Sequence, residues 1–223
     1  MPLARRLHRH RHYLKDKPVE DAALTDQLSS GLPAHERILE AARDLFCRYG
    51  IHATGVDKIL ATASASKMTL YSRFGSKDAL LREVLLREGS DWRQSFFAAV
   101  RSGGGSKDQL RGIVTALGGW YRGGRFFGCA FMNAIAEHDK DELWLREIAA
   151  GHHAIVLEFL SGLARHADYA EPDILSRQLL LLIDGATAAL MVTGDETVLM
   201  IAARNLAAIL DSAAVVTRQT QAK

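Results

Sequence analysis

From Ala34 onward, apolar residues recur at steps of three and four along almost the whole chain. This spacing places them on one face of an α-helix, whereas the alternation expected of a half-buried strand is essentially absent. Glycine, proline and capping residues divide the pattern into segments of ordinary helix length. The sequence therefore predicts an all-α fold, with short helices first and longer helices after them.

Two of the short helices are predicted close together, at 55–62 and 66–74, with an abrupt break between them. Thr54 offers a hydroxyl N-cap to the first of them, and Ser66 offers one to the second. Two short helices with a tight turn are the layout of a helix-turn-helix, whose second helix enters the major groove of DNA. The spacing alone is also compatible with an ordinary helical hairpin.

The second short helix divides its residues between two faces. Leu70 and Phe74 are four residues apart, so they share a face that can pack inward. The residues off that face are polar, basic or flexible, namely Lys67, Met68, Thr69, Tyr71, Ser72 and Arg73. We expect these side chains to meet the DNA.

The stretch from Ala34 to Val84 resembles the DNA-binding domain of TetR-family transcriptional regulators. The matching residues are Ile38-Leu39-Glu40-Ala41-Ala42-Arg43-Asp44-Leu45-Phe46, Gly50, Thr54, Ile59, Ser66-Lys67-Met68-Thr69-Leu70-Tyr71 and Phe74-Gly75-Ser76-Lys77-Asp78-Ala79-Leu80. The sequence departs from the common pattern at the turn, where Ser64-Ala65 replaces Gly-Val, and at Leu60, where Ala is frequent. Serine can support such turns through its hydroxyl.

The resemblance implies a role for each candidate residue. Contacts with phosphate are expected from Thr54, through its hydroxyl and nearby backbone N–H groups, and from Thr69, Tyr71 and Lys77. Contacts with base edges are expected from Lys67, Met68 and Ser72, while Arg73 can serve either purpose and Ser66 completes the set. Lys77 and Arg73 can also be read simply as solvated charges.

The last two predicted helices, at 172–193 and 196–216, are apolar on nearly all sides. Such helices are buried on nearly all sides, either in the core of one chain or between two chains. A single helix-turn-helix makes few contacts, and dimers place two recognition helices roughly 34 Å apart on a palindromic site. The family resemblance favours a homodimer held by a four-helix bundle of these two helices and their copies.

Most of the aromatic residues lie between residues 92 and 160, and the segment from Gly128 to Glu137 resembles part of one type of TetR regulatory domain. An aromatic cavity with a few polar groups suits a small, mostly apolar effector, although the same residues can simply form core. The candidate ligand residues are Phe96, Trp120, Phe127, Phe131, Asn133, Glu137 and His152. Glu137, His138, His152 and His153 lack a recognisable metal-ligand spacing, so no metal or other cofactor is expected.

The termini are expected to be a basic, disordered arm at 1–33 and a tail at 217–223. The first 17 residues carry six Lys and Arg against one Asp. Such an arm can touch DNA phosphate, but it can equally be a solvated tail or the product of a start codon placed too far upstream.

Composition narrows the location and the class of protein. Two cysteines, Cys47 and Cys129, disfavour a disulfide framework and favour the reducing cytoplasm, where either thiol can be a redox sensor or an inert buried group. Charged residues interrupt every long apolar run, so no membrane span is expected. We find no nucleophile elbow, phosphate-binding glycine loop or zinc-protease motif, so no enzymatic activity is expected.

These observations predict a ligand-responsive repressor with a DNA-binding domain at 34–84 and an effector-binding and dimerisation domain at 85–216. The helix that begins at Lys77 continues across Gly89 into the aromatic region, so it is a candidate lever between the two sites. Two alternatives remain, namely an activator or DNA binder without ligand control, and a helical small-molecule binder that lacks DNA binding.

Overall fold

The computed structural model describes residues 31–139 and 142–216. The helices in chain order are α2 (Ala34–Tyr49), α3 (Val56–Ala63), α4 (Lys67–Phe74), α5 (Lys77–Arg101), α6 (Ser106–Arg111), α7 (Ile113–Arg122), α8 (Ala130–Glu137), α9 (Leu143–His166), α10 (Pro172–Thr193) and α11 (Thr197–Ser212). Across these ranges the β pairing is a single isolated bridge between Tyr169 and Val215. The predicted all-α class is confirmed. The expected arm at 1–33 lies almost entirely outside the described residues, and so does the tail.

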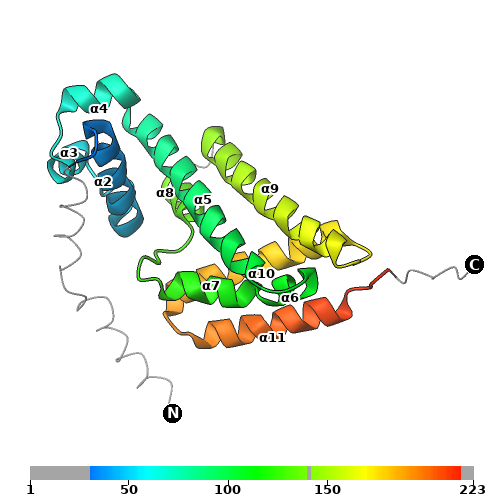
Figure 1. The fold of residues 1–223 in the computed structure, drawn as a ribbon. Coiled ribbons are helices and arrows are strands. Elements are labelled where there is room, and N and C mark those ends of the chain that lie inside the picture. The colour runs from blue at the N-terminus through cyan, green and yellow to red at the C-terminus, as the bar shows by residue number, and fades with distance from the viewer. Residues whose placement is uncertain (1–30, 140–141, 217–223) are drawn as a thin grey trace, which may run out of the picture.

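Helices α2, α3 and α4 form one end of the molecule, and α5 leads from them to the larger helical body (Figure 1). Helix α5 has 25 residues, which at a rise of about 1.5 Å per residue makes it roughly 37 Å long. Helices α7, α10 and α11 lie together at its far end. A single helix therefore belongs to both parts of the molecule, as the sequence predicted.

Capping residues fix where α4 and α5 begin. The Ser66 hydroxyl accepts a hydrogen bond from the Thr69 backbone N–H, and the Ser76 hydroxyl accepts one from the Ala79 N–H. Each bond satisfies a donor that the first helical turn would otherwise leave unpaired. The cap predicted at Ser66 is confirmed, and Ser76 caps α5 in the same way.

Helices α6 and α7 meet at Gly112. One helix boundary differs from the prediction. The last helix ends at Ser212, before the expected residue 216. There the chain becomes extended, and the Ala170 N–H donates to the Ala214 carbonyl at 2.8 Å.

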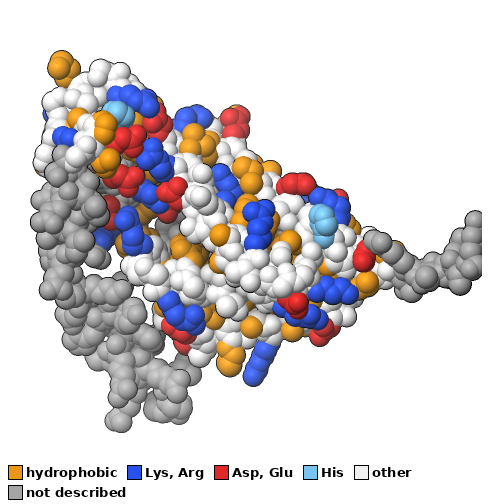
Figure 2. Space-filling view, in the orientation of Figure 1, with side chains coloured by type: hydrophobic (Ala, Val, Ile, Leu, Met, Phe, Trp, Pro, Cys, Tyr) orange, Lys and Arg blue, Asp and Glu red, His pale blue; other side chains and the backbone are white. Residues whose placement is uncertain are grey.

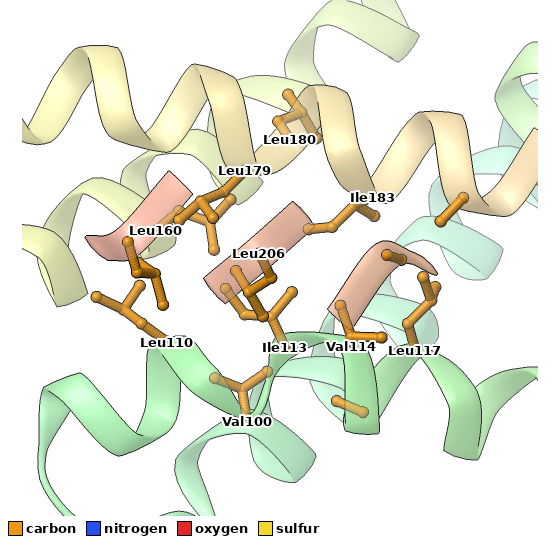
Figure 3. Packing of buried hydrophobic residues seen from close by; sticks show 14 of the residues in the cluster. Val100, Leu110, Ile113, Val114, Leu117, Leu160, Leu179, Leu180, Ile183 and Leu206 are labelled. Carbon is orange, nitrogen blue, oxygen red and sulfur yellow. The ribbon is translucent and has the colours of Figure 1, made fainter. Parts of the chain in front are cut away.

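The buried apolar residues form two clusters. The larger one lies between α5, α6, α7, α9, α10 and α11, where Leu110, Ile113, Leu160 and Leu206 converge (Figure 3). The smaller cluster joins α2, α3, α4 and the first turns of α5, and it includes residues of α8 and the start of α9, namely Phe131, Ala134, Leu145 and Ala149. Helix α8 therefore packs against the end formed by α2, α3 and α4, the candidate DNA-binding end, although it is distant from that end in sequence.

Helix α10 is long and apolar enough, by length and composition alone, to span a bilayer. The sequence prediction excluded this because Asp184 interrupts the helix. In the structure, Leu175, Leu179 and Ile183 of α10 lie in the larger core. Burial of this kind is what a core helix of a globular protein requires, so the helix carries no argument for a membrane.

Candidate nucleic-acid interface and inner pocket

Helix α4 is held by one face and presents the other to solvent. Leu70 and Phe74 are buried in the smaller core. Met68 is 80% exposed and Tyr71 is 50% exposed on the opposite side. An exposed methionine and an exposed tyrosine on a short helix anchored in the core are suited to contact the surface of a macromolecular partner. Six of the expected DNA contacts, Ser66, Lys67, Met68, Tyr71, Ser72 and Arg73, are exposed, and Thr69 is half-buried.

The basic side chains of α4 are paired with carboxylates in the structure. The Lys67 ammonium lies 2.8 Å from the Asp57 carboxylate, and the Arg73 guanidinium lies 3.1 Å from that of Glu83. The bond to Asp57 also raises the pKa of Lys67. Pairs this exposed contribute little stability, so DNA phosphate or base edges can displace the acidic partners. Sequence reasoning did not single out Asp57 or Glu83.

Charges of both signs cover the DNA-binding end on the face seen in Figure 2. One basic residue there, Lys58 of α3, was not among the expected contacts. Lys58 is exposed, and its ammonium lies 3.9 Å from the centre of the Tyr49 ring. The feature of the sequence that could have indicated Lys58 as a DNA contact was its position on the first short helix.

The Thr54 hydroxyl was expected to contact phosphate. In the structure it has a structural role instead, which corrects that expectation. The residue is fully buried, and the hydroxyl donates to the Gly50 carbonyl at 2.7 Å. Thr54 also does not cap α3, since the N-cap position is Gly55. A hydroxyl that satisfies a buried carbonyl is not available to phosphate without opening the loop.

Lys77 lies beside the same loop. Its ammonium donates to the Ile51 carbonyl at 2.6 Å and is half-buried near the Phe46 ring. An ammonium has three N–H donors, so this bond leaves capacity for a phosphate.

An inner pocket lies between α5, α7, α8, α9 and α10. Its lining includes Trp120, Phe131 and His152 from the expected ligand residues. The other residues that line it are Glu88, Gly89, Trp92, Gly128, Cys129, Ala130, Val156, Leu180, Ile183, Asp184 and Thr187. The cavity measures about 40 Å³, well below the size usual for ligand sites, so a ligand must widen it.

Four expected ligand residues do not line this pocket. Phe96 is buried behind it, stacked on Trp92, and Phe127 faces the Arg48 guanidinium. The Asn133 amide donates to the Phe127 carbonyl at 2.9 Å. Glu137 lies at the DNA-binding end. These four residues lie elsewhere because the packing of the chain decides which side chains meet at a cavity, and residue type alone does not give that packing.

A larger hollow of about 540 Å³ is an open groove between α7 and α11. Among the described residues, those lining the groove include no aromatic side chain, and Arg111, Arg122 and Asp211 lie at it. The smaller inner pocket has the aromatic walls that the sequence predicted. We therefore regard the inner pocket as the candidate ligand site.

Glu137, at the end of α8, binds the loop that precedes α3. Its carboxylate accepts hydrogen bonds from the backbone N–H groups of Ile51, at 2.7 Å, and of His52, at 3.0 Å. The His52 ring nitrogen lies 2.5 Å from the Glu137 carbonyl. We call this set of bonds the Glu137 contact. It ties α8 to the loop between α2 and α3.

Both cysteines are free thiols in half-buried positions. Burial raises the pKa of Cys47 to about 12 and also raises that of Cys129. Both groups are therefore protonated at neutral pH, which disfavours a reactive thiolate at either position.

The family described as bacterial regulatory proteins, tetR family, matches residues 38–84, which cover α2, α3, α4 and the start of α5. A solved structure, that of a TetR-family transcriptional regulator from Streptomyces coelicolor, is similar to this chain well beyond this segment. The two sequences are 30% identical. The alignment covers 80% of this chain and 94% of that one, with a TM-score of 0.72. The chain belongs to the TetR family of transcriptional regulators.

A second TetR-type regulator, a putative one from Streptomyces avermitilis, is 27% identical with a TM-score of 0.71, and the alignment covers 83% of this chain and all of that one. Within the TetR family, matches to curated proteins are shorter. The transcriptional activator FasR of Mycolicibacterium smegmatis is 36% identical over 89 residues, 39% of this chain and 41% of FasR. The regulator QacR of Staphylococcus aureus is 34% identical over 61 residues, 27% of this chain and 32% of QacR.

Proposed function

We propose that this TetR-family regulator is a cytoplasmic homodimeric repressor that binds a palindromic operator and releases it when a small molecule enters the inner pocket. The observation that carries the DNA-binding part is the outer face of α4. Leu70 and Phe74 fix the helix, so Met68 and Tyr71 stand exposed on a rigid support. Rigid presentation of a few side chains is what base readout in a major groove needs.

The contacts divide by chemistry. Lys67 can donate to guanine O6 or N7, Met68 can pack on a thymine methyl group, and Ser72 can reach either kind of base edge. Tyr71, Thr69 and Lys77 offer donors to phosphate, which position the domain without reading sequence. Lys58 is a further candidate for contact with phosphate, because it is an exposed cation on the neighbouring helix.

Release of DNA requires a connection between the pocket and α4. Helix α8 provides one, because Phe131 lines the pocket and Glu137 of the same helix binds Ile51 and His52. A ligand that widens the pocket pushes Phe131 and strains the Glu137 contact. A coupling free energy of about 1–3 kcal/mol changes the DNA affinity about 5–150-fold. Helix α5 is a second connection, because it carries both Lys77 and Trp92.

The experiment that tests this function is selection of bound sites from random duplex DNA with the purified protein. An enriched inverted repeat with half-sites one helical turn apart is the expected result. Recovery of no enriched sequence, together with weak binding that salt abolishes, would leave only nonspecific attraction to DNA and contradict the proposal.

Substitution of Lys67 tests base reading. We expect Lys67→Ala to weaken operator binding about 5–150-fold and to relax the base preference at one position in each half-site. Lys107→Ala is the matched control, because Lys107 is an exposed lysine on α6. If Lys67→Ala and Lys107→Ala bind the operator alike in fluorescence anisotropy, Lys67 does not read bases.

The name of FasR describes that protein as an activator, and its match includes the DNA-binding end. Activation by this chain is therefore the second candidate function. A reporter gene with the selected operator distinguishes the two candidates, since deletion of the regulator raises expression under a repressor and lowers it under an activator.

A further inference from the structure

Four aromatic rings, those of Trp92, Trp120, Phe131 and His152, line the inner pocket. The His152 ring stacks on Phe131 with centroids 4.4 Å apart, and the Trp92 ring lies 5.7 Å from Trp120, edge to face. Trp92 and His152 are neighbours at 5.4 Å. Flat, polarisable walls on several sides favour a planar, unsaturated ligand over a globular aliphatic one.

One residue of the pocket lining carries a buried donor without a partner. The Trp92 indole Nε1 is buried, and it makes no hydrogen bond to any residue that the structure describes. A buried donor without an acceptor costs about 1–3 kcal/mol, and such groups are rare enough to need a reason. A ligand oxygen placed against this N–H would remove the cost.

His152 supplies a second donor. The Arg93 guanidinium lies 2.9 Å from His152 Nδ1, and because a guanidinium can only donate, Nδ1 is the acceptor. Burial, with help from Arg93, lowers the pKa of His152 to about 4, so the ring is neutral at pH 7. A neutral ring that accepts at Nδ1 carries its proton on Nε2. Two neighbouring aromatic residues of the pocket lining therefore carry N–H donors.

The acidic groups of the pocket already have basic partners. Glu88 accepts a hydrogen bond from the Arg43 guanidinium, and Asp184 lies 3.5 Å from His153. The two carboxylates disfavour an anionic ligand, and the Arg93 guanidinium behind His152 disfavours a cationic one. Burial of an uncompensated charge is expensive, so the balance of these groups favours a neutral ligand.

We propose that the inner pocket takes a neutral aromatic carbonyl compound, whose oxygen accepts hydrogen bonds from Trp92 Nε1 and His152 Nε2 while its ring packs against Phe131 and Trp120. The proposal rests on the proposed function only in taking this pocket as the effector site.

The test is a set of four probes with one ring and different substituents, titrated into the full chain by calorimetry. The probes are acetophenone (neutral, with an acceptor), ethylbenzene (neutral, without one), benzoate (anionic) and phenyltrimethylammonium (cationic). We expect acetophenone to bind most tightly, about fivefold more tightly than ethylbenzene if one net hydrogen bond is gained.

Trp92→Phe removes the indole N–H and keeps an aromatic side chain. We expect it to weaken acetophenone binding about fivefold more than it weakens ethylbenzene binding, because only acetophenone loses a hydrogen bond. Trp144→Phe is the matched control, because the Trp144 indole donates to Glu142 and is not part of the pocket lining.

A measurement on the unmodified protein covers the case in which Trp92→Phe does not fold. The chain has three tryptophans and therefore three indole N–H resonances in an amide correlation spectrum. We expect one of them to move downfield with acetophenone and to stay in place with ethylbenzene.

Equal affinity for acetophenone and ethylbenzene, a preference for benzoate or the ammonium probe, or no binding of any probe would each overturn the ligand class. These outcomes are independent of DNA. A protein that binds acetophenone through Trp92 but selects no DNA site keeps the ligand class and loses the regulatory function, and the reverse result does the opposite.

Discussion

At the scale of single residues, Ser64 is where the sequence departs from the common TetR pattern and where the backbone adopts a conformation that is rare for L-residues. Its φ of 46° and ψ of 51° lie in the left-handed region. The Arg37 guanidinium supports this turn, donating to the Ala63 carbonyl at 2.9 Å and to the Ser64 carbonyl at 3.0 Å. The turn thus keeps the geometry that glycine would give, at a conformational cost that Arg37 offsets.

This geometry predicts that Ser64→Gly stabilises the protein. Left-handed backbone costs an L-residue about 1–2 kcal/mol, and glycine avoids that cost while losing part of the gain to a freer unfolded chain. We expect a net increase of about 1 kcal/mol in the free energy of unfolding, measured by urea denaturation. Ser64→Ala, which keeps a Cβ in the same conformation, should show no such increase. Equal stability of the two variants would contradict the explanation.

The buried, neutral His152 leads us to expect that the stability of the folded protein depends on pH. Its pKa in the folded protein is about 4, below the ordinary value of 6.5. Between these values the unfolded chain binds a proton that the folded chain excludes, so stability rises with pH across this window and is lost as the pH falls through it. The stability lost in this way approaches roughly 3 kcal/mol below pH 4.

The measurement is urea denaturation between pH 4.5 and 7 for the wild type and His152→Gln. We expect the variant to lose less stability over this range than the wild type does. Since the comparison uses the change with pH, an overall loss of stability in the variant does not affect it. Parallel pH profiles would show that His152 is not buried in its neutral form.

At the scale of elements, α8 is the helix whose role depends most on its packing. Its residues Phe131 and Ala134 belong to the core of the DNA-binding end, and Phe131 also lines the inner pocket. Its last residue, Glu137, holds the loop between α2 and α3. One short helix therefore contacts both the inner pocket and the loop between α2 and α3, the two sites that the proposed ligand control would connect.

We expect Glu137→Ala to loosen the loop at Ile51 and His52. Hydrogen bonds to a charged group contribute about 1.5–3 kcal/mol, so the amide exchange of these two residues should accelerate roughly 10- to 100-fold. Hydrogen exchange followed by NMR measures this directly. Glu147→Ala is the control, because Glu147 is an exposed glutamate on the neighbouring helix α9. Unchanged exchange at Ile51 and His52 would mean that the Glu137 contact does not order the loop.

At the scale of the whole molecule, α10 has an apolar stripe that the single chain leaves uncovered. Ile174, Leu181, Gly185 and Val192 are exposed on one side of the helix, and the half-buried Ala188 lies on the same side. Leu181 is 75% exposed and Val192 is 79% exposed. Burying such a stripe against a second copy is what a homodimer through the last two helices requires.

A substitution in this stripe can test dimer formation without disturbing the fold of the single chain. Leu181→Glu places a charge at an exposed position, so we expect the fold to persist while the dimer dissociates and operator affinity falls at least tenfold. Light scattering measures the mass, and anisotropy measures the affinity. Leu143→Glu is the control, since Leu143 of α9 is 65% exposed and lies outside α10. A dimer that survives Leu181→Glu would exclude this face as the interface.

The sequence by itself determined the features that depend on neighbours along the chain. Helix periods, the caps at Ser66 and Ser76 and the division of α4 between Leu70 and its exposed residues all involve positions within one or two helical turns. The same local regularity carried the family resemblance, because the DNA-binding helices are short and contiguous.

Only the tertiary structure decided the contacts between distant segments. Glu137 meets Ile51 86 residues away, and Arg93 meets His152 59 residues away. Thr54 lies inside because the loop after α2 folds back on Gly50. A periodic pattern gives each helix an apolar face but not its rotation or its partner, so it could not separate the residues that line the pocket from those that hold the DNA-binding end.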